Sequence, residues 1–184
     1  MHIPNLITLA RILLVPVTVW LIISEAYGAA FAAFVVAGAS DGLDGYLARR
    51  FNWRTKLGAY LDPLADKALL VSVYVTLGFL KELPAWLVII VVSRDVLIVG
   101  AVLLSRLLDH PVKVAPLMVS KVNTAAQIVF VVVVLGVAAL REPYDHLVNY
   151  GSIFVALLTV LSGAAYLVEW LRHMADGPHE EHKP

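Results

Sequence analysis

The stretch Asp41–Asp66 reads DGLDGYLARRFNWRTKLGAYLDPLAD and mixes acidic, basic and glycine residues between long apolar segments. Four of its residues are aspartates, and its basic residues cluster at Arg49, Arg50, Arg54 and Lys56. The apolar sequence on both sides is long enough to cross a bilayer. A carboxylate close to hydrocarbon is costly and is normally kept only where it faces a cavity, a partner or an ion. We therefore expect the functional site in this stretch.

Composition favours a membrane protein. Hydrophobic residues make up 60% of the 184-residue chain, against roughly 45–50% in soluble proteins. Six windows could each span a bilayer: Pro4–Ser24, Ala29–Arg49, Ala59–Leu80, Pro84–Leu107, Val119–Leu140 and His146–Arg172. The alternative, a water-soluble helical bundle, needs a polar stripe on each helix, and segments such as AWLVIIVV have none. The sequence predicts an all-α integral membrane domain of six transmembrane helices at 1–174 and a polar, disordered tail at 175–184.

Charge and cysteine content narrow the functional classes. The formal net charge is zero, so nothing attracts the whole chain to nucleic acid. Cysteine is absent, which excludes disulfides and thiolate metal ligands, and the six histidines form no convincing site. The N-terminus lacks a basic region and a small-residue cleavage site, so we expect the first apolar segment to be retained.

Lysine and arginine counts predict the orientation. Basic residues gather in the connections after the second and fourth spans and at the C-terminal end, whereas the opposite connections hold only Lys81 and Arg141. Loops rich in lysine and arginine face the cytoplasm. We expect the aspartate stretch and both termini on the cytoplasmic side, within reach of soluble substrates and of lipids in the inner leaflet.

The four aspartates fall on two helix faces. Asp41 and Asp44 are three residues apart and share one face of a helix. Asp62 and Asp66 are four residues apart and share a face of the next helix. A short basic turn makes these helices antiparallel, so the two faces can meet. Four converging carboxylates repel one another unless cations or protons compensate them, and hard divalent cations such as Mg²⁺ are the natural compensation.

Such a cluster suits phosphoryl chemistry. Two cations roughly 3.5–4 Å apart can clamp the oxygens of a phosphoryl centre during displacement. Small residues on the same faces, Gly45, Ala48 and Gly58, would let a flat or phosphorylated ligand approach the backbone. Arg49 could pair with a phosphate or could anchor a helix end at the membrane surface. The alternative is a purely structural cluster of ion pairs that involves Lys67 and the arginines.

The pattern D-x2-D-G-x2-A-R-x8-G-x3-D-x3-D, from Asp41 to Asp66, resembles the signature of the CDP-alcohol phosphotransferase family without a departure. The resemblance extends from the IPNLITLARI opening to about the sixth span. It implies a six-helix membrane fold, usually a homodimer, with a site that faces the cytoplasm. It also implies cleavage of a CDP-linked lipid by an alcohol, with release of CMP.

The resemblance also implies roles for individual residues. It implies that two divalent cations, Mg²⁺ or Mn²⁺, are bound by Asp41, Asp44, Asp62 and Asp66. Asp66 is also the expected base that takes the proton of the acceptor hydroxyl. The CDP-lipid is expected to contact Asp41, Gly45, Ala48, Arg49 and Gly58.

The acceptor has to be chosen by the rest of the chain. Within the family, the chain is most similar to the branch that makes phosphatidylglycerophosphate and cardiolipin. Phosphatidylglycerophosphate synthases usually carry Arg-Glu where this chain has Arg94-Asp95, and a second arginine at the position of Val102. Glycerol 3-phosphate is a dianion that needs several cations, whereas phosphatidylglycerol carries one charge and its own acyl chains. We expect phosphatidylglycerol as acceptor, giving cardiolipin; the alternative is glycerol 3-phosphate, giving phosphatidylglycerophosphate.

Arg94 and Lys121 are the residues expected to bind the acceptor phosphate, although Arg94 could instead pair with its neighbour inside the membrane. Further polar residues could support the site: Asn5, Thr8, Lys67, Asp95 and Asn123. A different class of protein, an ion or metal transporter that uses the four aspartates as its pathway, remains a distant alternative. Transporters often show paired repeats and broken helices near the midplane, whereas here the acids sit at one mouth, with small residues at positions that a nucleotide would need.

Overall fold

The computed structural model describes residues 3–50, 58–107, 118–141 and 145–175. Each described segment is largely helical, and the helices are α1 (Ile3–Ile23), α2 (Tyr27–Arg50), α3 (Gly58–Phe79), α4 (Ala85–Leu107), α5 (Met118–Leu140) and α6 (Asp145–Ala175). The prediction of an all-α chain with six long helices is confirmed, and every helix begins and ends within three residues of its expected span. Residues 176–184 of the expected tail, and most of the basic turn after α2, lie outside the described residues.

Tight turns close one end of the bundle. After α1, the amide of Ala26 bonds to the carbonyl of Leu21 (2.9 Å) and that of Glu25 to Ile22 (3.0 Å). This is the Schellman pattern, in which the residue after the helix adopts a left-handed conformation, and Glu25 has φ 56°. The same pair of bonds follows α3, where Lys81 has φ 65°. These turns hold consecutive helices close together at this end.

A hydrogen bond between side chains fastens the same end. The Tyr27 hydroxyl, at the start of α2, donates to Glu82 Oε1 at 2.8 Å, which ties α2 to the turn between α3 and α4. Burial and this contact with Glu82 raise the pKa of Tyr27 to about 12. Because the pKa is raised, the fold stabilises the protonated form of Tyr27. Tyr27 lies just before the expected span, which begins at Ala29.

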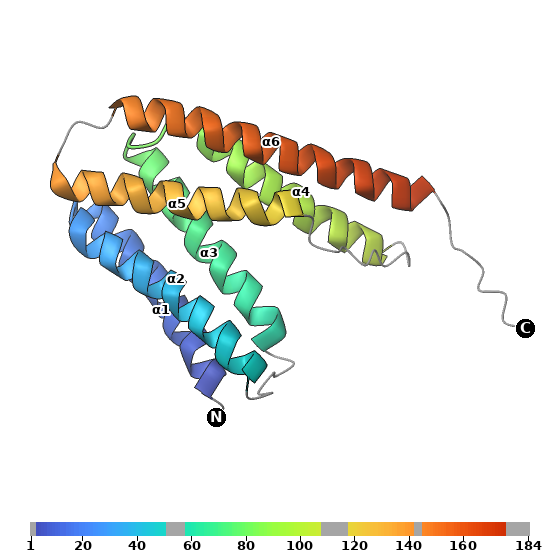
Figure 1. Cartoon of the computed structure of the whole chain (residues 1–184), viewed down its shortest axis with the longest axis horizontal. Coiled ribbons are helices and arrows are strands. Elements are labelled where there is room, and N and C mark those ends of the chain that lie inside the picture. Colours follow the sequence, from blue (N-terminus) through green and yellow to red (C-terminus); the bar gives the residue numbers. More distant parts are fainter. Residues whose placement is uncertain (1–2, 51–57, 108–117, 142–144, 176–184) are drawn as a thin grey trace, which may run out of the picture.

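The helices separate toward the other end. In Figure 1, α1, α2 and α3 run side by side and diverge from α5 and α6 toward the end at which α2 ends and α3 begins. The core that joins the two groups is apolar, with Val73, Tyr74 and Leu77 of α3 fully buried against α5 residues such as Val131 and Leu135. The aspartate-bearing helix ends therefore lie at the open end of the bundle.

Unlike a soluble bundle, the helices present an apolar exterior, and several polar side chains are buried beside the apolar core. Large apolar side chains are exposed along the outside, including Trp20 (65% exposed), Phe79 (83%) and Leu97 (65%). Polar residues are buried inside: Arg11, Thr18, Thr76, Arg94, Asp95, Asn123, Gln127, Ser152, Thr159 and Ser162. In hydrocarbon, polar groups have to be satisfied within the protein and the apolar side chains can face outward.

Two helices are long and apolar enough to cross a membrane among the described residues, at Met118–Leu140 and Asp145–Arg172. Shorter apolar stretches occupy Ala10–Ile23, Tyr27–Ser40 and Lys67–Phe79. Beyond these stretches, α2 continues to Arg50 and α3 already begins at Gly58.

Candidate active site

The backbone places the four aspartates on helices, as expected. Asp41 and Asp44 lie in the last three turns of α2, and Asp62 and Asp66 lie in the first three turns of α3. These two helices contact each other. Helical backbone at both places puts each pair of aspartates on one face of its helix. The side chains of residues 41–66 lie outside the described residues, so the convergence of the carboxylates remains a prediction.

An ion-paired group of three residues begins directly after the last aspartate. Lys67 Nζ on α3 lies 2.7 Å from Asp95 Oδ1 on α4. Arg94 Nη1 donates to the same oxygen at 2.6 Å. One carboxylate oxygen therefore serves two cations, and the three residues together carry a net charge of +1. We call these three residues the Lys67–Asp95–Arg94 triad.

Arg94 joins three helices. Its Nη2 donates to Ser120 Oγ on α5 at 2.6 Å and to Ser162 Oγ on α6 at 2.7 Å. The side chain is only 6% exposed. Arg94 therefore pairs with its neighbour Asp95, which is the alternative to binding of the acceptor phosphate. Arg94 Nε is buried and has no hydrogen-bond partner among the described residues.

Asn123 belongs to the contact between α5 and α6. Its Oδ1 accepts from the Thr159 hydroxyl at 2.9 Å, and the same hydroxyl accepts from Gln127 Nε2 at 3.1 Å. All three residues are buried. This network fixes the register of the two helices next to Ser120, and the supporting role expected for Asn123 can therefore be exerted through packing.

The other expected support and acceptor residues are less constrained by the structure. Lys121 is exposed near the beginning of α5, one residue after the serine that Arg94 binds. Asn5 and Thr8 lie in α1, and Val102 lies in α4, but their side chains are outside the described residues.

Arg11 is a buried cation whose position the sequence did not reveal. It follows Thr8 by three residues, a spacing that is equally typical of anchoring at a membrane surface. The side chain is 1% exposed, inside the group formed by α1, α2 and α3. A buried guanidinium needs compensating negative charge. The signal that could have found it is its place in an otherwise apolar span, where charge usually marks function.

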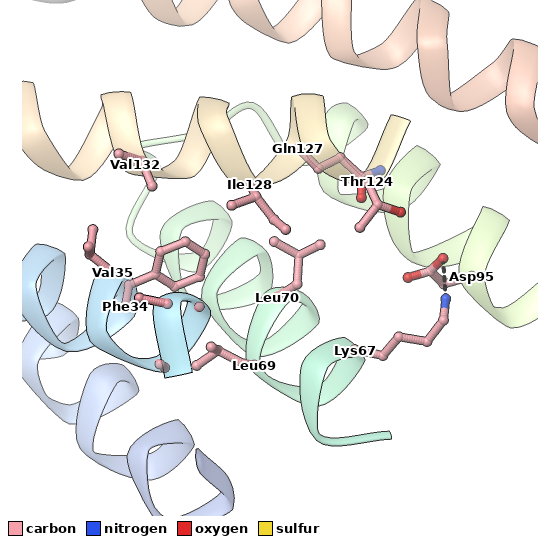
Figure 2. Close-up of a pocket in the computed structure, with 13 residues that line it drawn as sticks. Phe34, Val35, Lys67, Leu69, Leu70, Asp95, Thr124, Gln127, Ile128 and Val132 are labelled. Carbon is pink, nitrogen blue, oxygen red and sulfur yellow. Dashed lines mark hydrogen bonds and ion pairs between the residues drawn. The ribbon is translucent and has the colours of Figure 1, made fainter. Parts of the chain in front are cut away.

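A cavity of about 490 Å³ opens between α2, α3 and α5. Most of its lining is apolar, from residues such as Phe34, Leu70 and Ile128. Figure 2 shows Lys67 and Asp95, joined by their ion pair, at one end of it. Because Lys67 directly follows Asp66, this end lies close to the aspartate-bearing turn of α3. The shape and chemistry suit an apolar chain with a polar end.

The donor set fits a hard metal ion. Four carboxylates without a sulfur ligand suit Mg²⁺ or Mn²⁺. Among the residues whose side chains are described, no group of three or more His, Cys, Asp or Glu could hold a metal. Asp41, Asp44, Asp62 and Asp66 fall outside that set, and their binding of the ions remains a prediction.

Comparison with known proteins matches residues 1–169 to the family model for CDP-alcohol phosphatidyltransferase. The match covers the six helices almost completely and includes the aspartate motif at the end of α2 and the start of α3. The chain therefore belongs to the CDP-alcohol phosphatidyltransferase family, as the motif predicted. Membership favours a transferase over the transporter alternative.

Curated relatives carry two different acceptor names. The chain is 34% identical over 180 residues to the CMP-forming cardiolipin synthase of Homo sapiens, covering 89% of this chain and 60% of that protein. It is 36% identical over 193 residues to CDP-diacylglycerol–glycerol-3-phosphate 3-phosphatidyltransferase 1 of Oryza sativa, covering 92% of this chain and 57% of that protein. The Bacillus subtilis enzyme named for the glycerol 3-phosphate reaction is 33% identical over 184 residues, covering 90% of this chain and 93% of that protein.

The chain thus spans less than two thirds of the length of the first two relatives but nearly all of the bacterial one. Sequence identity to the cardiolipin synthase is almost the same as to the two enzymes named for glycerol 3-phosphate. Similarity alone therefore leaves the acceptor open, and the choice has to come from the chemistry of the site.

Proposed function

We propose that the chain is an integral membrane phosphatidyltransferase that moves a phosphatidyl group from CDP-diacylglycerol to a glycerol-type alcohol and releases CMP. The observation that carries the proposal is the aspartate motif at the adjoining ends of α2 and α3, in a chain that belongs to this family. The apolar exterior and polar interior support a position in the bilayer. We propose that α1 to α6 all span it.

In the proposed reaction, the acceptor hydroxyl oxygen attacks the phosphorus that carries diacylglycerol. The new P–O bond forms as the bond to the CMP oxygen breaks, and CMP leaves with that electron pair. Asp66 takes the proton of the hydroxyl. Asp41, Asp44, Asp62 and Asp66 would hold divalent cations, which supply charge stabilisation to the phosphoryl oxygens and the leaving group.

Binding of the nucleotide end falls to the small residues of the motif. Gly45, Ala48 and Gly58 lie in the same helix ends as the aspartates, where a residue without a large side chain lets the CDP group approach the backbone. Arg49 lies in the last turn of α2, and we propose that it pairs with a phosphate. The cavity between α2, α3 and α5 is the proposed place for an acyl chain of the donor.

We favour phosphatidylglycerol as the acceptor. Asp95 is shared by Arg94 and Lys67, so these three residues together carry a net charge of +1. This charge matches a singly charged phosphodiester better than the dianion of glycerol 3-phosphate. Lys121 is exposed beside Ser120 and could add one further cation. Glycerol 3-phosphate remains the second candidate because relatives named for it match nearly as well.

We propose that the aspartate end and both termini face the cytoplasm, because the connections richest in lysine and arginine lie on that side. This orientation would let CMP leave into water. A homodimer is part of the proposal because the family signature implies it.

The test is product formation by the purified protein from labelled CDP-diacylglycerol and Mg²⁺, with each acceptor supplied separately. Labelled cardiolipin with phosphatidylglycerol, at a rate well above that with glycerol 3-phosphate, supports the proposal. Product with glycerol 3-phosphate alone would overturn the choice of acceptor. Absence of CMP release with either acceptor would contradict the transferase itself.

A further inference from the structure

A second apolar cavity, of about 720 Å³, lies between α4 and α6. It follows α4 from Ile89 to Leu104, about 22 Å of helix, whereas one leaflet of hydrocarbon is about 15 Å thick. Exposed apolar side chains such as Val96, Leu97 and Leu167 form its walls. We call this cavity the α4–α6 groove. It is long enough for a lipid acyl chain.

Two residues with polar side chains line the groove. Arg94 and Tyr166 both line it and both are buried, with residue exposures of 5% and 8%. Arg94 Nε and the Tyr166 hydroxyl have no hydrogen-bond partner among the described residues. A buried donor that lacks a partner destabilises the fold. Two such donors in one apolar groove indicate a ligand that carries hydrogen-bond acceptors.

Charge specifies the kind of acceptor. Asp95 Oδ1 is shared by Lys67 and Arg94, so the base of the groove retains a net positive charge. Gly163 brings α6 close at this level, because a Cβ added there would lie 3.5 Å from Arg94 Cγ. A singly charged phosphodiester joined to an apolar chain matches these features, whereas a small dianion would leave the length of the groove without an occupant.

The two cavities also meet at one group of residues. The cavity between α2, α3 and α5 reaches Lys67 and Asp95, and the α4–α6 groove reaches Arg94. Transfer between two lipids needs two apolar grooves whose polar ends meet, and the triad provides that meeting point next to Asp66. A reaction with a water-soluble acceptor needs only one groove.

We propose that the α4–α6 groove binds the acceptor as a singly charged diacyl phospholipid, phosphatidylglycerol. Its phosphodiester accepts hydrogen bonds from Arg94 Nε and Tyr166, and one acyl chain lies along the groove. This inference rests on the proposed function for the identity of the reaction. The binding itself can be measured without turnover.

Two substitutions test the groove, and one serves as control. Ala164→Phe fills it from an exposed, groove-lining position on α6, and Tyr166→Phe removes the unpaired hydroxyl alone. The control is Leu161→Phe, which adds a ring at a position on α6 that is 60% exposed and does not line the groove. Circular dichroism and gel filtration in detergent establish that each variant is folded.

Native mass spectrometry of delipidated protein then counts bound phosphatidylglycerol and phosphatidylcholine. The wild type and Leu161→Phe should retain phosphatidylglycerol preferentially. Ala164→Phe should lower this retention by about tenfold, and Tyr166→Phe should lose most of the preference over phosphatidylcholine, also about tenfold. Kinetics should show a matching rise in KM for phosphatidylglycerol in both groove variants, with KM for CDP-diacylglycerol within about twofold of the wild type.

Equal retention by Ala164→Phe and Leu161→Phe, or no preference for phosphatidylglycerol in the wild type, would overturn the inference even if CMP release is normal. A change of oligomeric state in Ala164→Phe without a change in lipid retention would show that the groove is a protein interface, and would also overturn it. Preferential lipid retention without any CMP release would contradict the proposed function instead, and leave the binding site standing.

Discussion

Lys67 Nζ on α3 lies 2.7 Å from Asp95 Oδ1 on α4. Lys67 directly follows Asp66, the last aspartate of the motif. This ion pair connects the helix that carries the expected base to the helix that carries Arg94. Through Arg94 it reaches Ser120 on α5 and Ser162 on α6. The polar interior is therefore continuous from the aspartate-bearing helix to the opposite side of the bundle.

Removal of the shared carboxylate should destabilise the fold. In Asp95→Asn, Arg94 would be buried without its charged partner, a change that costs about 3 kcal/mol or more. The measurement is thermal unfolding in detergent, followed by circular dichroism. Lys67→Met is the matched control: the Lys67 side chain is 41% exposed, so its loss should cost less than about 1 kcal/mol. Equal costs for the two variants would contradict a triad centred on the buried pair.

Close packing of α5 on α6 should make Gly151 sensitive to substitution. A Cβ at this position would lie 2.3 Å from Cε2 of the buried Phe130. Gly151→Ala should therefore destabilise the protein by about 1–3 kcal/mol. Gly100→Ala on α4 is the control, since its Cβ would meet nothing within 4 Å, and it should be neutral or stabilise by up to about 1 kcal/mol. A neutral Gly151→Ala would show that the two helices are less tightly packed.

Burial of Tyr27, together with its bond to Glu82, should make stability depend on alkaline pH. The pKa of Tyr27 is raised from 10.0 to about 12, so the fold favours the protonated phenol. The stabilisation is fully present below pH 10 and is lost as the pH rises toward 12. Tyr27→Phe should lower stability by about 1 kcal/mol near neutral pH. The difference in Tm between wild type and variant should shrink at about pH 11; a difference that grows with pH would contradict this contact.

Removal of divalent cations should stop the reaction and leave the fold intact. EDTA treatment should abolish CMP release, and added Mg²⁺ or Mn²⁺ should restore it, because both suit oxygen ligands. The helical signal should change little, since the described core is apolar. Activity that survives exhaustive chelation would argue against the metal-binding role of the four aspartates.

The helices could be predicted because each apolar window matches one helix and the charged turns mark where helices end. For example, we expect α5 at Val119–Leu140, and it begins one residue earlier. The aspartate motif could be predicted because its members lie within two neighbouring helices. The two serine partners of Arg94 could not, since Ser120 and Ser162 are 26 and 68 residues away and many serines share their local pattern. The burial of Arg11 and the two cavities depend on helix packing, which no local spacing encodes.

The central claim is that Asp66 serves as the base in a CMP-forming transfer. The direct measurement is CMP release from CDP-diacylglycerol and acceptor by wild-type protein and by Asp66→Asn, with Glu169→Gln on the exposed surface of α6 as control. We expect Asp66→Asn to lose CMP release, by at least about a hundredfold, while its gel-filtration profile and helical content match those of the wild type. CMP release by Asp66→Asn at the rate of the wild type and of Glu169→Gln would contradict the account.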